Sequence, residues 1–413
     1  MVKKGYKQTE IGVIPEDWAI KYLSDFGKVQ GGGTPSTTMA DYWGGDIAWC
    51  TPSDITSAPT KYINATERAI TDLGLKNSAA TVMPAGSILL CTRATIGELK
   101  INSIPMATNQ GFKNIAINKG GNVDFLYYLL QTKKDRMLEL AIGSTFLEIS
   151  KTALCKIPLQ TPMHSDEQSK IADALSDIDS LVEVLENQIS KKKAIKQGTM
   201  QELLTGKRRL PGFSGEWNKC KLGSLGVFLK GTGISRNESN SGKLPAVRYG
   251  ELYTKHQNYV TNYFSSISKE VASNAKRVYR GDILFAASGE TKEEIGKCAA
   301  IIHETPVYAG GDILIFRPTV QLNPEFMGTL LNTADVCKQR AEKGQGDAIV
   351  HIHADALSNI EITIPNIEEQ QAIADILVDV DKGIERLDKK LDKYRQVKQG
   401  MIQQLLTGKI RLV

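Results

Sequence analysis

Apolar residues recur at alternating steps of four and three positions along two separate stretches, residues 166–210 and 368–412. An apolar position every 3.5 residues on average predicts a long helix with an apolar seam that must be buried against a partner. We expect the two helices to pair with each other within the chain; the alternative is that each packs on its own neighbouring domain. The seam positions are Ile171, Leu175, Ile178, Val182, Leu185 and Ile189 in the first stretch, and Ile373, Leu377, Val380, Ile384, Leu387 and Leu391 in the second.

The two stretches are copies of one another. The second begins 202 residues after the first, aligns with it without a gap, and is identical at about half of the positions. A helix from Glu167 to Leu204 would span roughly 57 Å. Glycine is unfavourable inside a helix, so we hypothesise that Gly198 and Gly400 allow close backbone approach where the helices cross. The shared blocks include a carboxylate at each helix start and a glycine stop signal at each end: Glu167-Gln168 with Glu369-Gln370, and Leu203–Lys207 with Leu405–Lys409.

The segments between the helices contain short β-like runs broken by Gly, Pro, Asn and Asp, together with short helical patterns. We predict an α+β fold: two pseudo-symmetric globular domains with curved sheets, separated by two long antiparallel coiled-coil helices. The predicted parts are residues 1–162, 163–206, 207–365 and 366–413, which alternate domain and helix. The predicted strands are Ser87–Cys91, Asn114–Ile117, Asp282–Ala286, Ala299–Ile302 and Asp312–Phe316, the short helices Val123–Gln131 and Pro324–Leu331, and the surface loops Gln30–Pro35 and Gly231–Gly242.

Composition narrows the class of protein. With 413 residues, 41% hydrophobic and 23% charged, the chain is typical of globular proteins of two to four domains. No apolar run is long enough for a signal core or a membrane span, so we expect a soluble, intracellular (cytoplasmic) protein. The net charge is +5, but residues 191–209 and 389–413 each carry +6. These basic helix ends lie either near phosphates or on an ordinary solvated surface.

Loop residues have diverged between the two domains while the helices have not. Thr92–Thr95 corresponds to Ala287–Glu290, and Thr51–Asp54 corresponds to Arg248–Glu251, with little identity in either pair. Duplicated enzymes usually keep the same chemical groups in both halves. A constant frame with two unlike loop sets instead predicts two different binding surfaces at a fixed distance.

Four phrases occur along the chain in a fixed order. They are the opening Tyr6-Lys7…Ile11-Gly12…Ile14-Pro15…Trp18, the phrase Gly32-Gly33-Thr34-Pro35-Ser36, the twice-found Pro-x(4–5)-Glu-Gln…Ile-Ala helix start, and the twice-found Leu-Leu-Thr-Gly-Lys-x-Arg-Leu ending. In this order they resemble the specificity subunits of type I restriction-modification systems, over essentially the whole chain.

The resemblance implies a function. Each variable domain would be a target recognition domain that reads one half of a bipartite DNA sequence, and the helices would set the gap between the halves. The helices would also dock two modification subunits, which methylate adenine with S-adenosylmethionine. Two restriction subunits, which use ATP and Mg²⁺, would translocate and cut the DNA. This chain itself would hold no cofactor.

Bases are distinguished by hydrogen-bond donors and acceptors at groove edges, so a DNA reader needs polar side chains on protruding loops. Arg93 and Arg248 are the best candidates for bidentate guanine contacts. The alternative is that these are ordinary polar loop residues. The candidate DNA contacts are Thr51, Ser53, Asp54, Thr92, Arg93, Thr95, Asn109, Gln110 and Lys113 in the first domain, and Arg248, Tyr249, Ser288, Glu290, Thr291, Lys292 and His351 in the second.

Two short motifs resemble parts of catalytic or metal sites. Glu98-Leu99-Lys100 has the end of a nuclease motif, and His351-x-His353 would place two imidazoles on one strand face as a metal pair, but short matches of both kinds are common. The spacing of a phosphate-binding loop and the Asn-Pro-Pro-aromatic phrase of the methyltransferases are missing. We therefore expect a non-catalytic subunit without a metal site. The rival functions are a coiled-coil adaptor that binds proteins, and a nuclease or methyltransferase with an unrecognised site.

Overall fold

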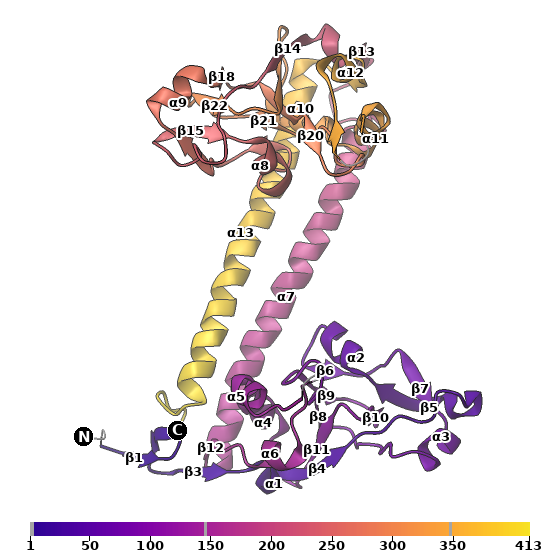
Figure 1. Ribbon diagram of the computed structural model, residues 1–413, viewed down its shortest axis with the longest axis vertical. Coiled ribbons are helices and arrows are strands. Elements are labelled where there is room, and N and C mark those ends of the chain that lie inside the picture. Colours follow the sequence, from indigo (N-terminus) through magenta and orange to yellow (C-terminus); the bar gives the residue numbers. More distant parts are fainter. Residues whose placement is uncertain (1–3, 144–146, 347–348) are drawn as a thin grey trace. The chain divides into compact units, whose positions relative to one another are not determined.

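The computed structural model describes residues 4–143, 147–346 and 349–413. The chain forms two compact units: unit 1 comprises residues 1–188 and 388–413, and unit 2 comprises residues 189–387. The helices α7 (Ser165–Leu203) and α13 (Ile367–Leu405) are each shared between the two units. Each unit mixes sheets with helices, as the predicted α+β fold requires (Figure 1).

Unit 1 is built around a five-stranded sheet in the order β4-β11-β8-β9-β6. Strands that alternate with these along the sequence form a three-stranded sheet in the order β10-β5-β7. Two-stranded sheets β1-β2 and β12-β3 complete the unit. Its elements are β1 (Tyr6–Thr9), β2 (Gly12–Pro15), β3 (Trp18–Lys21), α1 (Leu23–Phe26), β4 (Gly27–Gly31), η1 (Ala40–Tyr42), β5 (Trp43–Cys50), α2 (Pro52–Ser57), β6 (Tyr62–Ile63), β7 (Arg68–Ile70), α3 (Asp72–Lys76), β8 (Ile88–Leu90), β9 (Leu99–Asn102), β10 (Ala107–Thr108), β11 (Lys113–Ile117), α4 (Val123–Gln131), α5 (Lys134–Glu139), α6 (Lys151–Cys155) and β12 (Leu159–Pro162).

Unit 2 repeats this plan. Its five-stranded sheet has the order β14-β23-β19-β21-β16, and β17-β15-β22-β18, β13-β25 and β20-β24 form the other sheets. Its elements are β13 (Asn218–Lys221), η2 (Leu222–Ser224), β14 (Gly226–Lys230), β15 (Leu244–Val247), α8 (Tyr249–Thr254), β16 (Tyr259–Val260), β17 (Ser265–Ile267), α9 (Lys269–Asn274), β18 (Lys276–Val278), β19 (Ile283–Ala286), β20 (Ser288–Gly289), β21 (Cys298–Ile301), β22 (Val307–Ala309), β23 (Ile313–Pro318), α10 (Pro324–Leu330), α11 (Ala334–Lys343), β24 (Val350–His351), α12 (Ala354–Ser358) and β25 (Glu361–Ile364).

The predicted strands and short helices are confirmed within one or two residues at their ends. One predicted loop needs correction: Gln30 and Gly31 belong to β4, and the chain leaves the sheet only at Gly32. A Cβ on Gly32 or Gly33 would collide with backbone at Thr108 and Ala79, so this glycine phrase lets two backbone segments pack closely.

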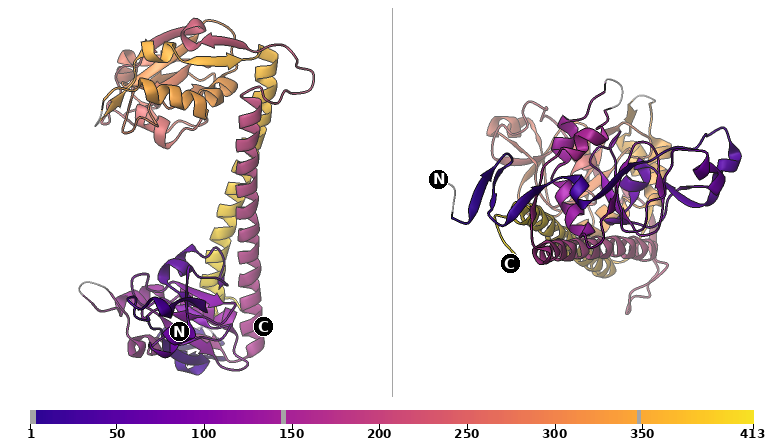
Figure 2. Two further views of the ribbon diagram at one scale, coloured as in Figure 1. Left: turned by 90° about the vertical axis from the view of Figure 1, so that its right-hand side faces the viewer. Right: turned by 90° about the horizontal axis from the view of Figure 1, so that it is seen from below.

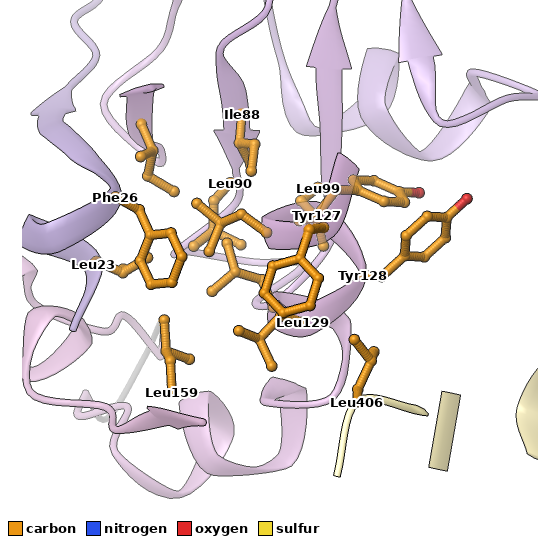
Figure 3. Packing of buried hydrophobic residues seen from close by; sticks show 14 of the residues in the cluster. Leu23, Phe26, Ile88, Leu90, Leu99, Tyr127, Tyr128, Leu129, Leu159 and Leu406 are labelled. Atoms are coloured by element: carbon orange, nitrogen blue, oxygen red, sulfur yellow. The ribbon is translucent and has the colours of Figure 1, made fainter. Parts of the chain in front are cut away.

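The core of unit 1 lies between its five-stranded sheet, α4 and the two long helices. Figure 3 shows Tyr127 and Leu129 of α4 among Leu90 and Leu99 of the sheet. Leu406, just beyond α13, joins the same cluster from the far end of the sequence. The core of the unit therefore includes residues from both ends of the chain, and Figure 2 shows the C-terminal segment returning to this unit.

The predicted pairing of the helices is confirmed within each unit. In unit 1 the first turns of α7 pack with the last turns of α13, so the helices run antiparallel; in unit 2 the last turns of α7 pack with the first turns of α13. The seam positions Ile171, Leu175, Ile373 and Leu377 are buried. Burying a side chain of this kind contributes roughly 1.5–3 kcal/mol to the stability of the fold, relative to leaving it exposed. Val182, Val380 and Leu387 are half-buried.

The hypothesis about the helix glycines is wrong. A Cβ placed on Gly198 or Gly400 would meet nothing within 4 Å, so no close backbone approach within the described chain requires glycine there. The helix-end glycines, in contrast, fulfil their prediction: Gly206 and Gly408 have φ of +68° and +69°, the left-handed conformation that ends a helix.

Candidate nucleic-acid interface

Most candidate contact residues of unit 1 gather where three chain segments meet. The amide of Asn109 donates to the carbonyl of Cys50 (3.1 Å), which fixes the loop after β10 beside the end of β5. The amide of Thr92 donates to the carbonyl of Gly111 (2.8 Å), which brings in the segment after β8. Arg93 in turn forms a β-bridge with Glu148. Residues distant in sequence, from Thr51 to Lys113, thus share one region of unit 1.

Unit 2 forms the same region from equivalent segments. The amide of Gly310 donates to the carbonyl of Val247 (3.0 Å), and the amide of Ala287 donates to the carbonyl of Asp312 (2.8 Å). The bridge equivalent to Arg93–Glu148 joins β20 to β24, with Ser288 opposite His351. The backbone arrangement is repeated while the side chains differ.

Two of the candidates of unit 1 are engaged in local structure. The side chain of Asp54 accepts from the amide (2.7 Å) and hydroxyl (2.6 Å) of Thr51 and from the amide of Glu67 (2.9 Å). These contacts form a capping box at the N-terminus of α2. Arg248 and Glu251 hold the equivalent positions at the start of α8 in unit 2, so the diverged loops keep one capping frame.

Thr92 must be withdrawn from the candidates. Its side chain is fully buried and its hydroxyl donates to the carbonyl of Gly111 (3.1 Å). The hydroxyl oxygen of Thr95 is likewise buried. Sequence could not show this because the burial follows from pairing with a segment about twenty residues away. Tyr249, Glu290, Thr291 and Lys292 of unit 2, with Ser53 and Gln110 of unit 1, are exposed.

Glu148 was missed by the sequence reasoning. It lies in the bridge with Arg93, and its carboxylate pairs with Lys113 Nζ at 3.3 Å. The sequence held part of the information, because His351 was a candidate. His351 occupies the position in unit 2 that Glu148 occupies in unit 1. Finding it required the register of the bridge, which the short, dissimilar flanking sequences do not reveal.

A cleft of about 500 Å³ opens beside the Ser288–His351 bridge of unit 2. The hydroxyl of Ser288 lies 3.0 Å from Nδ1 of His351, and the His351 side chain is exposed whereas Ser288 is buried. The charged groups that line the cleft are Lys230, Asp312 and Asp355, and His353 lines it too.

The joint between each long helix and its unit is held by a repeated trio. In unit 1, Glu167 at the start of α7 accepts from Trp18 Nε1 (3.2 Å) and forms a bidentate pair with Arg411 (2.6 and 2.9 Å). The guanidinium of Arg411 also binds Asp17 and holds the pKa of that carboxyl below its usual range. Because Glu167 is buried, this pair replaces the water that its charge would otherwise bind.

Unit 2 repeats the trio with Glu369, Trp217 and Arg209. Glu369 accepts from Trp217 Nε1 (3.2 Å) and from Arg209 (2.7 Å for both bonds). The arginine of each ending phrase thus clamps the start of the other long helix. The twice-found phrases of the sequence are therefore the two sides of one joint.

A second repeated contact fixes the globular part of each unit to the helix pair. In unit 1, Asp179 of α7 accepts from the hydroxyl of Tyr128 (2.7 Å) and pairs with Lys398 of α13 (2.5 Å). In unit 2, Asp381 accepts from Tyr259 (2.7 Å) and pairs with Lys196 (2.5 Å). Burial, reinforced by the nearby carboxylate, raises the pKa of Tyr259, so its hydroxyl stays protonated and donates.

These contacts engage part of the two basic helix ends. Lys196 and Lys398 face carboxylates across the helix pair, and Arg395 pairs with Glu186 at 2.6 Å. Arg209 and Arg411 are likewise paired with carboxylates, those of Glu369 and Glu167. The rest of each basic run, including Lys191–Lys193, is exposed, and both interpretations of it stay predictions.

The two charged residues of the Glu98-Leu99-Lys100 motif are engaged in contacts within the fold. Glu98 pairs with Lys134 at 2.5 Å, and Lys100 donates to the backbone carbonyls of Ala58 and Thr60. Burial lowers the pKa of Lys100. Among residues 4–143, 147–346 and 349–413, no three His, Cys, Asp or Glu side chains gather as a metal-binding group. None of the helices in those ranges is long and apolar enough to cross a membrane.

Comparison with known proteins matches both halves of the chain to one family model. The model, described as type I restriction modification DNA specificity domain, matches residues 15–194 and 214–393. The MjaIX specificity subunit of Methanocaldococcus jannaschii is 43% identical over 180 residues, which cover 43% of this chain and 41% of that protein. The MjaVIII specificity subunit of the same organism is 23% identical over 418 residues, covering 97% of this chain and 94% of that protein.

Solved structures show the same fold. The specificity (S) subunit of the type I restriction-modification system from M. genitalium superposes with a TM-score of 0.60 at 15% identity, covering 94% of this chain and 96% of that one. A second solved chain comes from work on complex assembly and conformational transition of the type I R-M system. It superposes with a TM-score of 0.57 at 15% identity, covering 96% of this chain and 99% of that one.

Proposed function

Since the chain belongs to the type I restriction modification DNA specificity family and carries two target recognition domains, we propose that each domain reads one half of a bipartite, asymmetric DNA site. The observation that carries the proposal is the repeated region in which β5, β8 and the loop after β10 converge in unit 1, and β15, β19 and the loop before β23 in unit 2. The same backbone presents Arg93 and Glu148 in one unit, and Ser288 and His351 in the other. Two such surfaces would recognise different bases.

We further propose that the helix pair sets the spacing between the half-sites. Each of α7 and α13 begins in one unit and ends in the other. The number of residues in the helices would therefore set the distance between the two half-sites that are read. The seam has a period of seven residues, so deleting one heptad from each helix preserves the buried contacts while shortening the pair. We expect that deletion to shorten the recognised gap and to leave the half-sites unchanged.

The proposed partners are two modification subunits and two restriction subunits. S-adenosylmethionine would bind the former, and ATP with Mg²⁺ the latter, while this chain is the non-catalytic subunit. The twofold repetition of the joints supports two copies of one partner, because equivalent surfaces bind equivalent subunits. The positions of Glu98 and Lys100 in structural contacts support the absence of a nuclease role for that motif.

A selection from random duplex DNA tests the function. The chain assembled with its modification subunits is incubated with a randomised pool at 150 mM salt, and the bound fraction is sequenced. We expect one sequence with two fixed parts and a spacer of constant length. Enrichment of a single contiguous sequence would contradict two separate readers, and no enrichment would favour the protein-binding adaptor.

A matched pair of variants assigns the halves. Arg93→Ala in unit 1 should relax one base of one half-site and leave the other half-site intact. Lys28→Ala, an exposed charge on β4 of the same unit, serves as the control and should leave both unchanged. Uniform weakening on all sequences by Arg93→Ala would mark Arg93 as a phosphate contact instead.

A further inference from the structure

The bridge between β20 and β24 places a histidine ring at the surface of unit 2 with a fixed partner beneath it. Ser288 is buried, and its hydroxyl oxygen lies 3.0 Å from His351 Nδ1. The carbonyl of Ser288 accepts from the hydroxyl of Tyr253 at 2.9 Å, which holds this strand in place from the other side. The imidazole is therefore oriented by a neighbour rather than free to rotate.

The hydrogen-bond inventory favours one tautomer of His351. A serine hydroxyl has one proton to donate, and burying it without an acceptor is costly. The structure pairs the Ser288 hydroxyl with Nδ1 of His351, a contact in which either atom can be the donor. The cost of burying the hydroxyl proton without an acceptor favours the hydroxyl as donor to Nδ1, which leaves the proton of the neutral ring on Nε2. The exposed side of the ring is a hydrogen-bond donor.

The charges around the cleft favour a base over a phosphate as the partner of this donor. Asp312 and Asp355 line the cleft with Lys230, so two carboxylates face one ammonium. A phosphate there would meet a surplus of negative charge, whereas the edge of a base is neutral. In the major groove a donor recognises purine N7, guanine O6 or thymine O4.

We propose that His351, held by Ser288 as the Nε2–H tautomer, is a specificity-determining residue that donates to one major-groove acceptor in the half-site of unit 2. This proposal rests on the proposed function of the two units. In unit 1 the equivalent bridge holds Arg93 and Glu148, with Lys113 paired to Glu148. The two half-sites therefore differ at this position because one bridge presents a guanidinium and the other a single imidazole donor.

The test removes base acceptors one at a time. The wild-type complex with its modification subunits binds its selected DNA site, in which 7-deazapurines remove N7, 2-aminopurine removes guanine O6, and 5-methylpyrimidin-2-one removes thymine O4. We expect one substitution in the half-site of unit 2 to weaken binding on the order of 10-fold, as for the loss of one base contact. His351→Ala should weaken binding to natural DNA by a similar factor and then be insensitive to that substitution.

Two further variants separate recognition from structure. His353→Ala removes the neighbouring histidine of the same cleft and should keep the full 10-fold penalty of the modified base. Ser288→Ala leaves the ring but frees Nδ1, so both tautomers become available. It should reduce the penalty while leaving the melting temperature near that of wild type, a pattern that a purely structural role of Ser288 would not give.

The outcomes distinguish a failure of the His351 contact from a failure of DNA reading by the two units. If the wild-type complex selects no gapped site, the proposed function fails and the inference fails with it. If the gapped site is selected but His351→Ala and every modified base act additively, the function stands and the His351 contact is refuted. Sensitivity to 3-deazaadenine alone would place the contact in the minor groove and refute the major-groove assignment.

Discussion

At the joints to the long helices, units 1 and 2 use the same residues; at their loop regions they use different ones. Glu167 and Glu369 each bind a tryptophan and an arginine in the same geometry. The bridges of the loop regions hold Arg93 opposite Glu148 in one unit and Ser288 opposite His351 in the other. Residues that fix the joints are therefore repeated, and the residues of the loop bridges are exchanged.

The Asp–Tyr–Lys contact lies between these extremes. Asp179 and Asp381 are repeated on the helices, but their tyrosine partners come from different elements, Tyr128 from helix α4 and Tyr259 from strand β16. The carboxylate and the lysine belong to the constant frame, whereas each variable domain supplies a hydroxyl in its own way. Recognition domains that differ in local structure can thus be attached to the same pair of helices.

The largest expected effect comes from breaking the joint of unit 1. Arg411→Ala leaves Glu167 buried with Trp18 as its side-chain partner among the described residues, and removing one side of a buried charge pair costs about 3 kcal/mol. We expect unit 1 to loosen while unit 2 keeps its stability, measured by denaturant unfolding and by hydrogen exchange of each unit. Lys409→Ala, an exposed charge two residues away, is the control. Equal effects of the two variants would show that the clamp adds nothing to stability.

Much of this frame was predictable from the sequence, because it repeats. The seam from Ile171 to Ile189 has a helical period and a copy with apolar residues at the same places, and Glu167 and Arg411 lie inside matched phrases. That Glu167 binds Arg411 could not be predicted, since it joins residues 244 positions apart. A residue that is identical in both copies can be predicted to have a structural role, but the identity does not show which residue it contacts.

The recognition surface was predictable only as a set of polar loops. Thr92 and Arg93 were both candidates, yet pairing with Gly111 buries Thr92 and leaves Arg93 half-exposed. Local sequence cannot distinguish them, because burial depends on the partner strand. The glycine hypothesis failed for a related reason: Gly198 is repeated, but no backbone of the described chain comes near it.

The pH dependence of stability should differ between the units. His256 of unit 2 is buried, both ring nitrogens lack a hydrogen-bond partner, and burial, with Lys297 nearby, lowers its pKa to about 4. In the unfolded chain the pKa is near 6.5. The unfolded state therefore takes up the proton first as pH falls, so stability is unaffected above about pH 6.5 and decreases between 6.5 and 4.

The variant His256→Phe tests this asymmetry, since it keeps a ring beside Phe264 and removes the titrating group. The nearest acidic group is Glu251, whose Oε2 lies 3.9 Å from His256 Nε2. We expect the midpoint of urea unfolding of wild-type unit 2 to fall more between pH 7 and pH 5 than that of the variant. His353→Ala, on an exposed side chain, should follow wild type. Parallel pH curves for wild type and His256→Phe would contradict a neutral buried imidazole.

A smaller effect should follow from removing the tyrosine hydroxyls. Tyr259→Phe deprives Asp381 of one hydrogen bond but leaves its pair with Lys196, so we expect a loss of about 1.5 kcal/mol, as for a bond to a charged group. Tyr128→Phe should cost unit 1 a similar amount if the two contacts are equivalent despite their different origins. Tyr62→Phe, whose exposed hydroxyl donates to Asp124, is the matched control and should cost less than either. A large difference between Tyr128→Phe and Tyr259→Phe would show that equivalent carboxylates do not imply equivalent anchoring.

The smallest effect, and the one of opposite sign, concerns the two helix glycines. Because a Cβ at position 198 or 400 would meet nothing within 4 Å, alanine should fit without strain and raise stability by about 0.5–1 kcal/mol at each site through its better helix propensity. Thermal unfolding of Gly198→Ala and Gly400→Ala measures this, with Gly408→Ala as the contrasting variant, since its φ of +69° and the nearby Pro15 ring make a side chain unfavourable there. A loss of stability in Gly198→Ala would mean that glycine is needed by the fold in a way the helix geometry does not show. If both alanines instead stabilise the chain yet weaken its assembly with the modification subunits, the glycines are kept in both copies for the approach of a partner, and the repetition of the frame extends from the fold to the assembly.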